Sequence, residues 1–111
     1  MGEERVQLGE FEELVLMITA ILHEQAYGVK VMDEILEQTG RKVNISAVHT
    51  ALDRLEKKGF LSSYTGGATA ERGGRSKRFF KVSNLGIQAL QINHRQRNTL
   101  FEQIPEVLLK S

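Results

Sequence analysis

The chain of 111 residues contains no cysteine, no tryptophan and a single proline, Pro105. Without cysteine it can form no disulfide, no thiolate nucleophile and no cysteine-based zinc site, as is common for proteins of a reducing compartment. The longest nearly unbroken apolar run, residues 14–22, is too short to cross a bilayer. It also follows acidic residues, unlike the core of a signal peptide. We therefore expect a cytoplasmic protein that has no membrane partner.

Groups that would support catalysis or metal binding are also missing. No nucleophile lies beside a base, no pair of carboxylates converges, and no glycine-rich loop is followed by a lysine that opens a helix. The three histidines, His23, His49 and His94, fall on separate predicted elements without a second ligand at metal-binding spacing. The sequence thus predicts a protein that is not an enzyme and that uses no cofactor and no metal.

Length and composition are those of one globular domain over residues 1–111. The hydrophobic fraction is 41% and the charged fraction 26%, and 111 residues suffice for one ordinary core. We expect this domain to consist of a core over residues 8–82 and a C-terminal helix and tail over residues 83–111.

Positive charge is concentrated in one part of the chain. Residues 41–81 hold ten Lys or Arg against three Asp or Glu, a net charge of +7, whereas residues 1–40 hold two against nine. The overall net charge of +1 therefore conceals a strongly dipolar chain. Such a basic segment indicates a surface that meets phosphate, although alone it is also typical of a solvated face.

Hydrophobic spacing predicts two helices in the acidic part. The first covers residues 8–24 and is apolar on most sides, which predicts that it is largely buried, either in the domain core or partly in a subunit contact. The second covers residues 27–39 and ends at Gly40 in the left-handed conformation. The apolar stripe of this second helix consists of Val29, Met32, Ile35 and Leu36.

A third helix is expected to begin at Ser46, whose hydroxyl would cap it, and to run to about Lys58. Its buried face consists of Val48, Ala51, Leu52 and Leu55, so the opposite face is polar and mixed in chemistry. The preceding segment, residues 41–45, is short enough to pair as one extended strand.

Two strands and a long helix complete the predicted order. Residues 60–65 and 76–82 have strand-like composition, and the loop between them has four glycines in ten positions and two arginines. The last helix is expected from about Asn84 to Ile104, capped by Ser83 and ended by Pro105. Its two apolar stripes consist of Leu85, Ala89, Ile92 and Leu100, and of Ile87, Leu90, Phe101 and Ile104. Two apolar sides at the end of a small domain predict a second subunit.

This order predicts a mainly α-helical fold with a small β-hairpin wing, that is, a winged helix-turn-helix followed by a long C-terminal dimerisation helix. The third helix is narrow enough to enter a major groove, where its polar face could contact base edges. The glycine-rich loop would carry Arg72 and Arg75 to the flanking DNA backbone.

The chain resembles the PadR family of bacterial transcriptional regulators over about residues 8–90. The resemblance rests on Tyr27-Gly28, on the segments 46–59 and 73–83, and on Ser83-Asn-Leu-Gly86. The short C-terminal region is similar to that of the small subclass, in which a single long helix makes a homodimer. The resemblance implies binding of double-stranded DNA at a pseudo-palindromic operator, generally as a repressor.

Two positions and one absence depart from the pattern of the family. His49 stands where a tyrosine that reaches the DNA is common, and Thr50 stands where a proline is common. The chain also lacks the tryptophan with which some short members stack flat aromatic ligands at the dimer centre. The first two departures bear on base preference and the third on the chemistry of an effector.

The residues that we expect to bind DNA are Ser46, His49, Thr50, Arg54, Lys57, Arg72, Arg75, Lys77 and Arg78. The residues that we expect at the dimer interface are Leu85, Ile92, Leu100, Phe101 and Ile104. The polar middle of the last helix, residues 93–99, could solvate a central opening of the dimer or hold a small polar or anionic effector near Arg97. The alternative function is a winged-helix module that binds a protein through the same hairpin.

Overall fold

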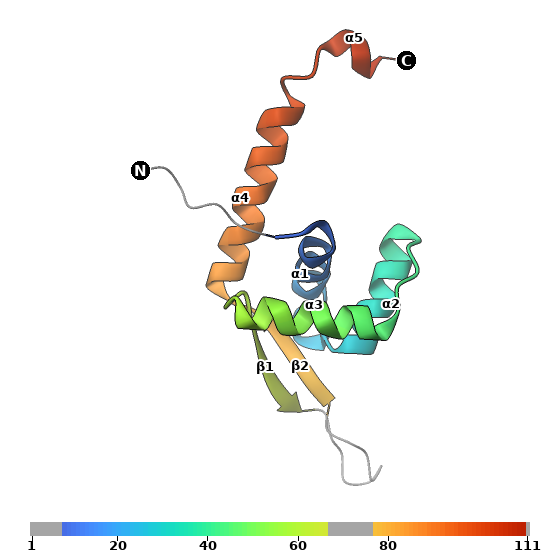
Figure 1. The fold of residues 1–111 in the computed structure, drawn as a ribbon, viewed down its shortest axis with the longest axis vertical. Coiled ribbons are helices and arrows are strands. Elements are labelled where there is room, and N and C mark those ends of the chain that lie inside the picture. Colours follow the sequence, from blue (N-terminus) through green and yellow to red (C-terminus); the bar gives the residue numbers. More distant parts are fainter. Residues whose placement is uncertain (1–7, 67–76, 111) are drawn as a thin grey trace.

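The computed structural model describes residues 8–66 and 77–110, and it is mainly helical with one β-hairpin (Figure 1). In chain order the elements are α1 (Glu10–Leu22), the 3₁₀ turn η1 (His23–Gln25), α2 (Gly28–Thr39), α3 (Ile45–Lys57), β1 (Leu61–Gly66), β2 (Lys77–Val82), α4 (Asn84–Phe101) and α5 (Glu106–Leu109). The predicted order of three helices, hairpin and long helix is confirmed. The described residues contain no helix that is long and apolar enough to span a bilayer.

The core lies where α1, α2, α3 and the hairpin meet. Its largest fully buried side chains include Phe80 from β2, Leu16 from α1, Ile35 from α2, and Leu52 and Leu55 from α3. Every one of these elements therefore contributes at least one large apolar group to a shared interior. Burial of such groups is the main favourable term in the folding of a domain of this size.

The first helix, α1, is largely buried as predicted, since only Glu10, Met17 and Ile21 of its residues are exposed. The packing side of α2 differs from the sequence-based expectation. In α2 Val29 and Leu36 are exposed, while Val31 is buried with Ile35. The reason is that α2 packs on α1 and α3 through its Gly28, Val31 and Ile35 edge, which is rotated from the predicted stripe.

The hairpin is antiparallel and is tied to the chain before α2. Leu61 pairs with Val82 at its base and Gly66 with Lys77 at the described end of the strands. The backbone N–H of Phe80 donates to the carbonyl of Ala26 at 2.8 Å, beside a bridge between Tyr27 and Phe79. The segment before α2 thus flanks β2, a pairing that residues 41–45 do not provide because residues 41–44 are coil and Ile45 begins α3.

The fourth helix starts on the core and then leaves it. Ser83 caps it as predicted, its hydroxyl accepting the N–H of Gly86 at 3.0 Å. The helix ends at Phe101, not at Ile104, and Pro105 then caps the single turn of α5. Beyond its first turns α4 projects away from the other elements (Figure 1).

At Gly86 the first turn of α4 lies close against Phe60, just before β1, and Val82 of β2. A Cβ atom built there would lie 2.3 Å from the carbonyl oxygen of Phe60 and 2.8 Å from Cγ1 of Val82. The nearer of these atoms, the oxygen of Phe60, belongs to the backbone, and shifting the backbone to relieve the clash would cost free energy. Only glycine therefore allows α4 to begin where it does.

Gly86→Ala should lower the free energy of unfolding by about 2 kcal/mol, because the clash outweighs the gain of about 1 kcal/mol in helix propensity. Denaturant unfolding followed by circular dichroism measures this. Gly66→Ala is the control, since its Cβ would meet only ordinary contacts of 3.8 Å or more. Equal stabilities of the two variants would contradict the packing described.

Candidate nucleic-acid interface

The polar face of α3 presents four exposed side chains in one row, here called the α3 ridge: Ser46, Thr50, Asp53 and Lys57. They follow one another at intervals of four, three and four residues, which places them on the same side of a helix. The opposite side consists of Val48, Ala51, Leu52 and Leu55, all buried as predicted. The core therefore fixes which side of α3 faces outward.

The start of α3 differs from the expectation. Asn44, not Ser46, is the N-cap, and its side-chain oxygen accepts the N–H of Ala47 at 2.7 Å. Ser46 lies in the first turn and is exposed. Asparagine is among the strongest capping residues, so Asn44 could have been recognised from its type alone. Ser46 is left with its hydroxyl on the ridge and without a capping role.

His49 lies on the flank of the ridge where α3 meets the start of α2. A Cβ atom at Gly28 would lie 2.6 Å from Cε1 of the His49 imidazole, so the ring rests against the Gly28 backbone. His49 is nevertheless exposed. Gly28 thus leaves room for a ring at this position.

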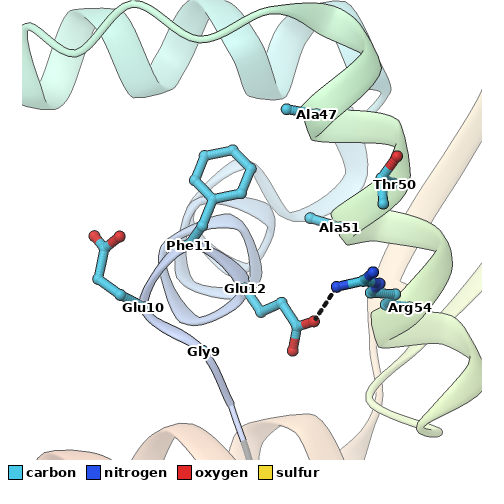
Figure 2. A pocket seen from close by; sticks show the side chains of 8 residues that line it. All are labelled: Gly9, Glu10, Phe11, Glu12, Ala47, Thr50, Ala51 and Arg54. Atoms are coloured by element: carbon cyan, nitrogen blue, oxygen red, sulfur yellow. Dashed lines mark ion pairs between the residues drawn. The ribbon is translucent and has the colours of Figure 1, made fainter.

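Arg54 lies on the opposite flank, beside the first turn of α1 (Figure 2). Its guanidinium is 3.9 Å from Glu12, whose carboxylate is also 2.6 Å from the ammonium of Lys58. The Glu12 side chain is only 13% exposed, and its carboxylate pairs with both of these cations. Between α1 and α3 is an open hollow lined by Gly9, Glu10, Phe11, Glu12, Ala47, Thr50, Ala51 and Arg54.

The two cations at the first positions of β2, far from the base of the hairpin, lie on opposite faces of the strand. Arg78 turns toward α3, where it pairs with Asp53 at 3.2 Å and also with Glu56. Lys77 turns the other way and lies 4.1 Å from the centre of the Tyr27 ring. Sequence alone missed the acidic partners of Arg78, because they are 22 and 25 residues away along the chain. Arg72 and Arg75 lie outside the described residues.

The residues expected at a dimer interface are mostly exposed in one copy of the chain. Leu85, Leu100, Phe101 and Ile104 are exposed, and Ile92 is partly buried. The exposed apolar side chains continue through Val107, Leu108 and Leu109 of α5, which the sequence-based prediction omitted. The two predicted stripes of α4 are not separate surfaces, since Ala89 of one and Leu90 of the other both pack toward the core.

The polar middle of α4 is connected to α1 through Arg97, whose guanidinium is 3.4 Å from the carboxylate of Glu13. Arg95, Gln96, Thr99 and Leu100 line an open hollow on the helix. Within residues 8–66 and 77–110, no three His, Asp or Glu side chains are grouped so that they could hold a metal ion.

Residues 17–92 match the model of the PadR-like family of transcriptional regulators. The chain belongs to this family. A PadR family regulator from Eggerthella lenta has a similar structure, with a TM-score of 0.69 at 19% identity over 92% of this chain and 88% of that one. No curated protein sequence matches.

Two further structures have the same fold. A PadR-like transcription factor from Bacteroides fragilis gives a TM-score of 0.71 at 19% identity, over 87% of this chain and 88% of that one. A PadR family regulator from Clostridium difficile gives 0.70 at 21% identity, over 90% and 99%. The PadR-like winged helix predicted from the sequence is thereby confirmed, and the family is one of transcriptional regulators that bind DNA.

Asn44→Ala should destabilise the protein by about 1 kcal/mol, because it removes the side-chain cap of α3. Ser46→Ala, the matched change two residues later, should cost less than about 0.5 kcal/mol. Thermal or denaturant unfolding of both variants measures the difference. A larger cost for Ser46→Ala would restore Ser46 as the cap.

Proposed function

We propose that the protein is a sequence-specific DNA-binding regulator that acts as a homodimeric repressor on a pseudo-palindromic operator. The observation that carries this proposal is the α3 ridge, an exposed polar row on a helix whose opposite face is anchored in the core. A rigid helix that presents such a row suits the major groove. A regulator that binds the chromosome would act in the cytoplasm, the location expected above.

Within this proposal the residues of the α3 ridge and of its two flanks make different contacts with the DNA. Ser46 and Thr50 would meet base edges or phosphates through their hydroxyls, and Lys57 would meet the backbone from the end of the helix. His49 and Arg54 would act from the two flanks. Arg72, Arg75 and Lys77 would carry the hairpin to the adjacent backbone, where charge matters more than geometry.

The exposed apolar side chains of α4 and α5 support the dimer. Leu100 and Phe101 lie at the end of α4 and Leu108 lies on α5, and all three are exposed, so a monomer would keep them in water. Contiguous apolar surface of this kind typically marks a protein interface. A second copy joined through it would provide a second α3 and hence a reader for the second half-site.

The alternative is a winged-helix module that holds a protein partner through the hairpin. DNA binding and protein binding differ in their response to salt, because a protein that neutralises phosphates releases condensed counterions. Anisotropy of a labelled duplex from upstream of the gene itself, compared with a scrambled duplex at several salt concentrations, separates the two. Tight, salt-sensitive preference for the native duplex is expected; equal and weak binding of both would contradict an autoregulating repressor.

Lys57→Ala should weaken binding to the native and scrambled duplexes by similar factors, since a phosphate contact carries no sequence information. The slope of log K against log salt should become shallower by about 0.9. Lys110→Ala removes the same charge beyond α5 and should leave the slope unchanged. If the Lys57→Ala variant kept the slope of the wild type, Lys57 would not contact a phosphate.

Phe101→Glu should convert the dimer to a monomer, because it would place a carboxylate in the apolar contact. Sedimentation velocity at micromolar concentration measures the mass. Val29→Glu is the matched control, since Val29 on α2 is 47% exposed and Phe101 is 58% exposed. A wild-type chain that sediments as a monomer, or a Phe101→Glu variant that stays dimeric, would contradict the proposed interface.

A further inference from the structure

We propose that Arg78 is a positioning residue that fixes the hairpin at a set angle to α3, and that it does not contact DNA itself. The four residues involved are here called the hairpin clamp: Asp53 and Glu56 from α3, Ser63 from β1 and Arg78 from β2. The role of the clamp in DNA binding rests on the function proposed above, whereas its role in holding the hairpin does not.

The guanidinium of Arg78 is held from three directions. Its Nη1 is 3.2 Å from Asp53 Oδ1, its Nη2 donates to Glu56 Oε1, and its Cζ lies 4.8 Å from the centre of the Phe80 ring. Phe80 is fully buried, so the ring itself cannot shift. A planar fork held at two nitrogens and at one face has a defined orientation, which a lysine could not reproduce.

Glu56 connects both strands of the hairpin to α3. One carboxylate oxygen accepts from Arg78 of β2, and the other accepts the hydroxyl of Ser63 of β1 at 2.7 Å. Ser63 pairs with Phe80 across the hairpin, so the two tethers lie at neighbouring positions of the ladder. The glutamate therefore fixes the plane of the hairpin and not merely its distance from α3.

A two-stranded hairpin is marginally stable without such packing. The other face of the hairpin is held by ring contacts. The Tyr64 and Phe79 rings are stacked with their centroids 5.6 Å apart, and Tyr27 lies edge-on to Phe79 at 5.5 Å. Lys77 lies over the ring of Tyr27. Because the hairpin is held from both faces, the direction in which its strands leave Gly66 and Lys77 is set by the clamp on one side and the rings on the other.

The clamp also changes how charge acts at the interface. Asp53 lies on the α3 ridge, where an unpaired carboxylate would repel DNA phosphates. Arg78 compensates this charge, so the pair adds little net attraction. Charge alone predicts that loss of Glu56 would strengthen DNA binding, whereas a positioning role predicts that it would weaken it. The two interpretations of Arg78 thus differ in the sign of an effect.

Hydrogen exchange of the free protein tests the clamp without DNA. Arg78→Gln and Glu56→Gln should each raise the exchange rates of amides in β1 and β2 by roughly twofold to fivefold, the range expected for a partly exposed ion pair. Amides of α1 and α2 serve as the internal reference for global stability. Lys81→Gln, on the opposite face of the same strand, should leave the hairpin rates unchanged. Unchanged rates in Arg78→Gln and Glu56→Gln would overturn the clamp.

Titration with the native duplex tests the consequence for DNA. Glu56→Gln and Arg78→Gln should both weaken binding, each with the salt dependence of the wild type, and the double variant should be no weaker than the weaker single one. Tighter binding by Glu56→Gln, together with a slope for Arg78→Gln shallower by about 0.9, would make Arg78 a phosphate contact and overturn the proposal. If the wild type bound no DNA, the proposed function as a DNA-binding regulator would be contradicted. The exchange rates would still show whether the clamp holds the hairpin.

Discussion

The buried face of α3 packs between α1, α2 and the hairpin, and this contact positions the candidate DNA-binding residues that the structure describes. Val48, Leu52 and Leu55 are fully buried there. Since a helix is rigid, burying these three side chains leaves no freedom in the direction of Ser46, Thr50 and Lys57 on the other side. The same core holds Phe80 and through it the base of the hairpin, so the helix and the wing are placed by one interior.

The dipolar charge of the sequence becomes a set of contacts in the folded chain. Acidic residues of α1 lie against the basic part, with Glu10 paired to Arg41 at 2.8 Å and Glu12 shared by Lys58 and Arg54. Exposed ion pairs of this kind contribute little to stability. Their larger effect is on the interface, because cations already engaged with carboxylates attract phosphate less than a count of charges suggests. Net charge along the sequence therefore overstates the basic surface.

The order of elements could be predicted from the sequence because it depends on local signals. Helical spacing, the Ser83 cap and the glycine-rich loop each act within a few residues, and the family motifs lie in the same order. The buried face of α3 was predictable for the same reason. Which side of α2 packs was not, because Val31 and Val29 are equally apolar and only the position of α1 and α3 distinguishes them.

Apart from the Asn44 cap, which is local, the features of the site that the sequence missed depend on distant parts of the chain. Asp53 and Glu56 look like ordinary helix acids until β2 brings Arg78 beside them, and Gly28 looks like a helix start until His49 rests on it. Lys77 and Arg78 are neighbours in the sequence, yet the alternation of a strand turns them to opposite faces. Such roles follow from tertiary contacts and not from residue type.

The most direct test of the account is nuclear magnetic resonance of the labelled protein titrated with its operator duplex. The account predicts that the largest chemical-shift changes fall on amides of residues 46–57 and 77–82, with little change in α2 beyond its first turn. Largest changes on the acidic face of α1 and α2, or along α4, would contradict the assignment of α3 and the hairpin as the DNA-binding surface.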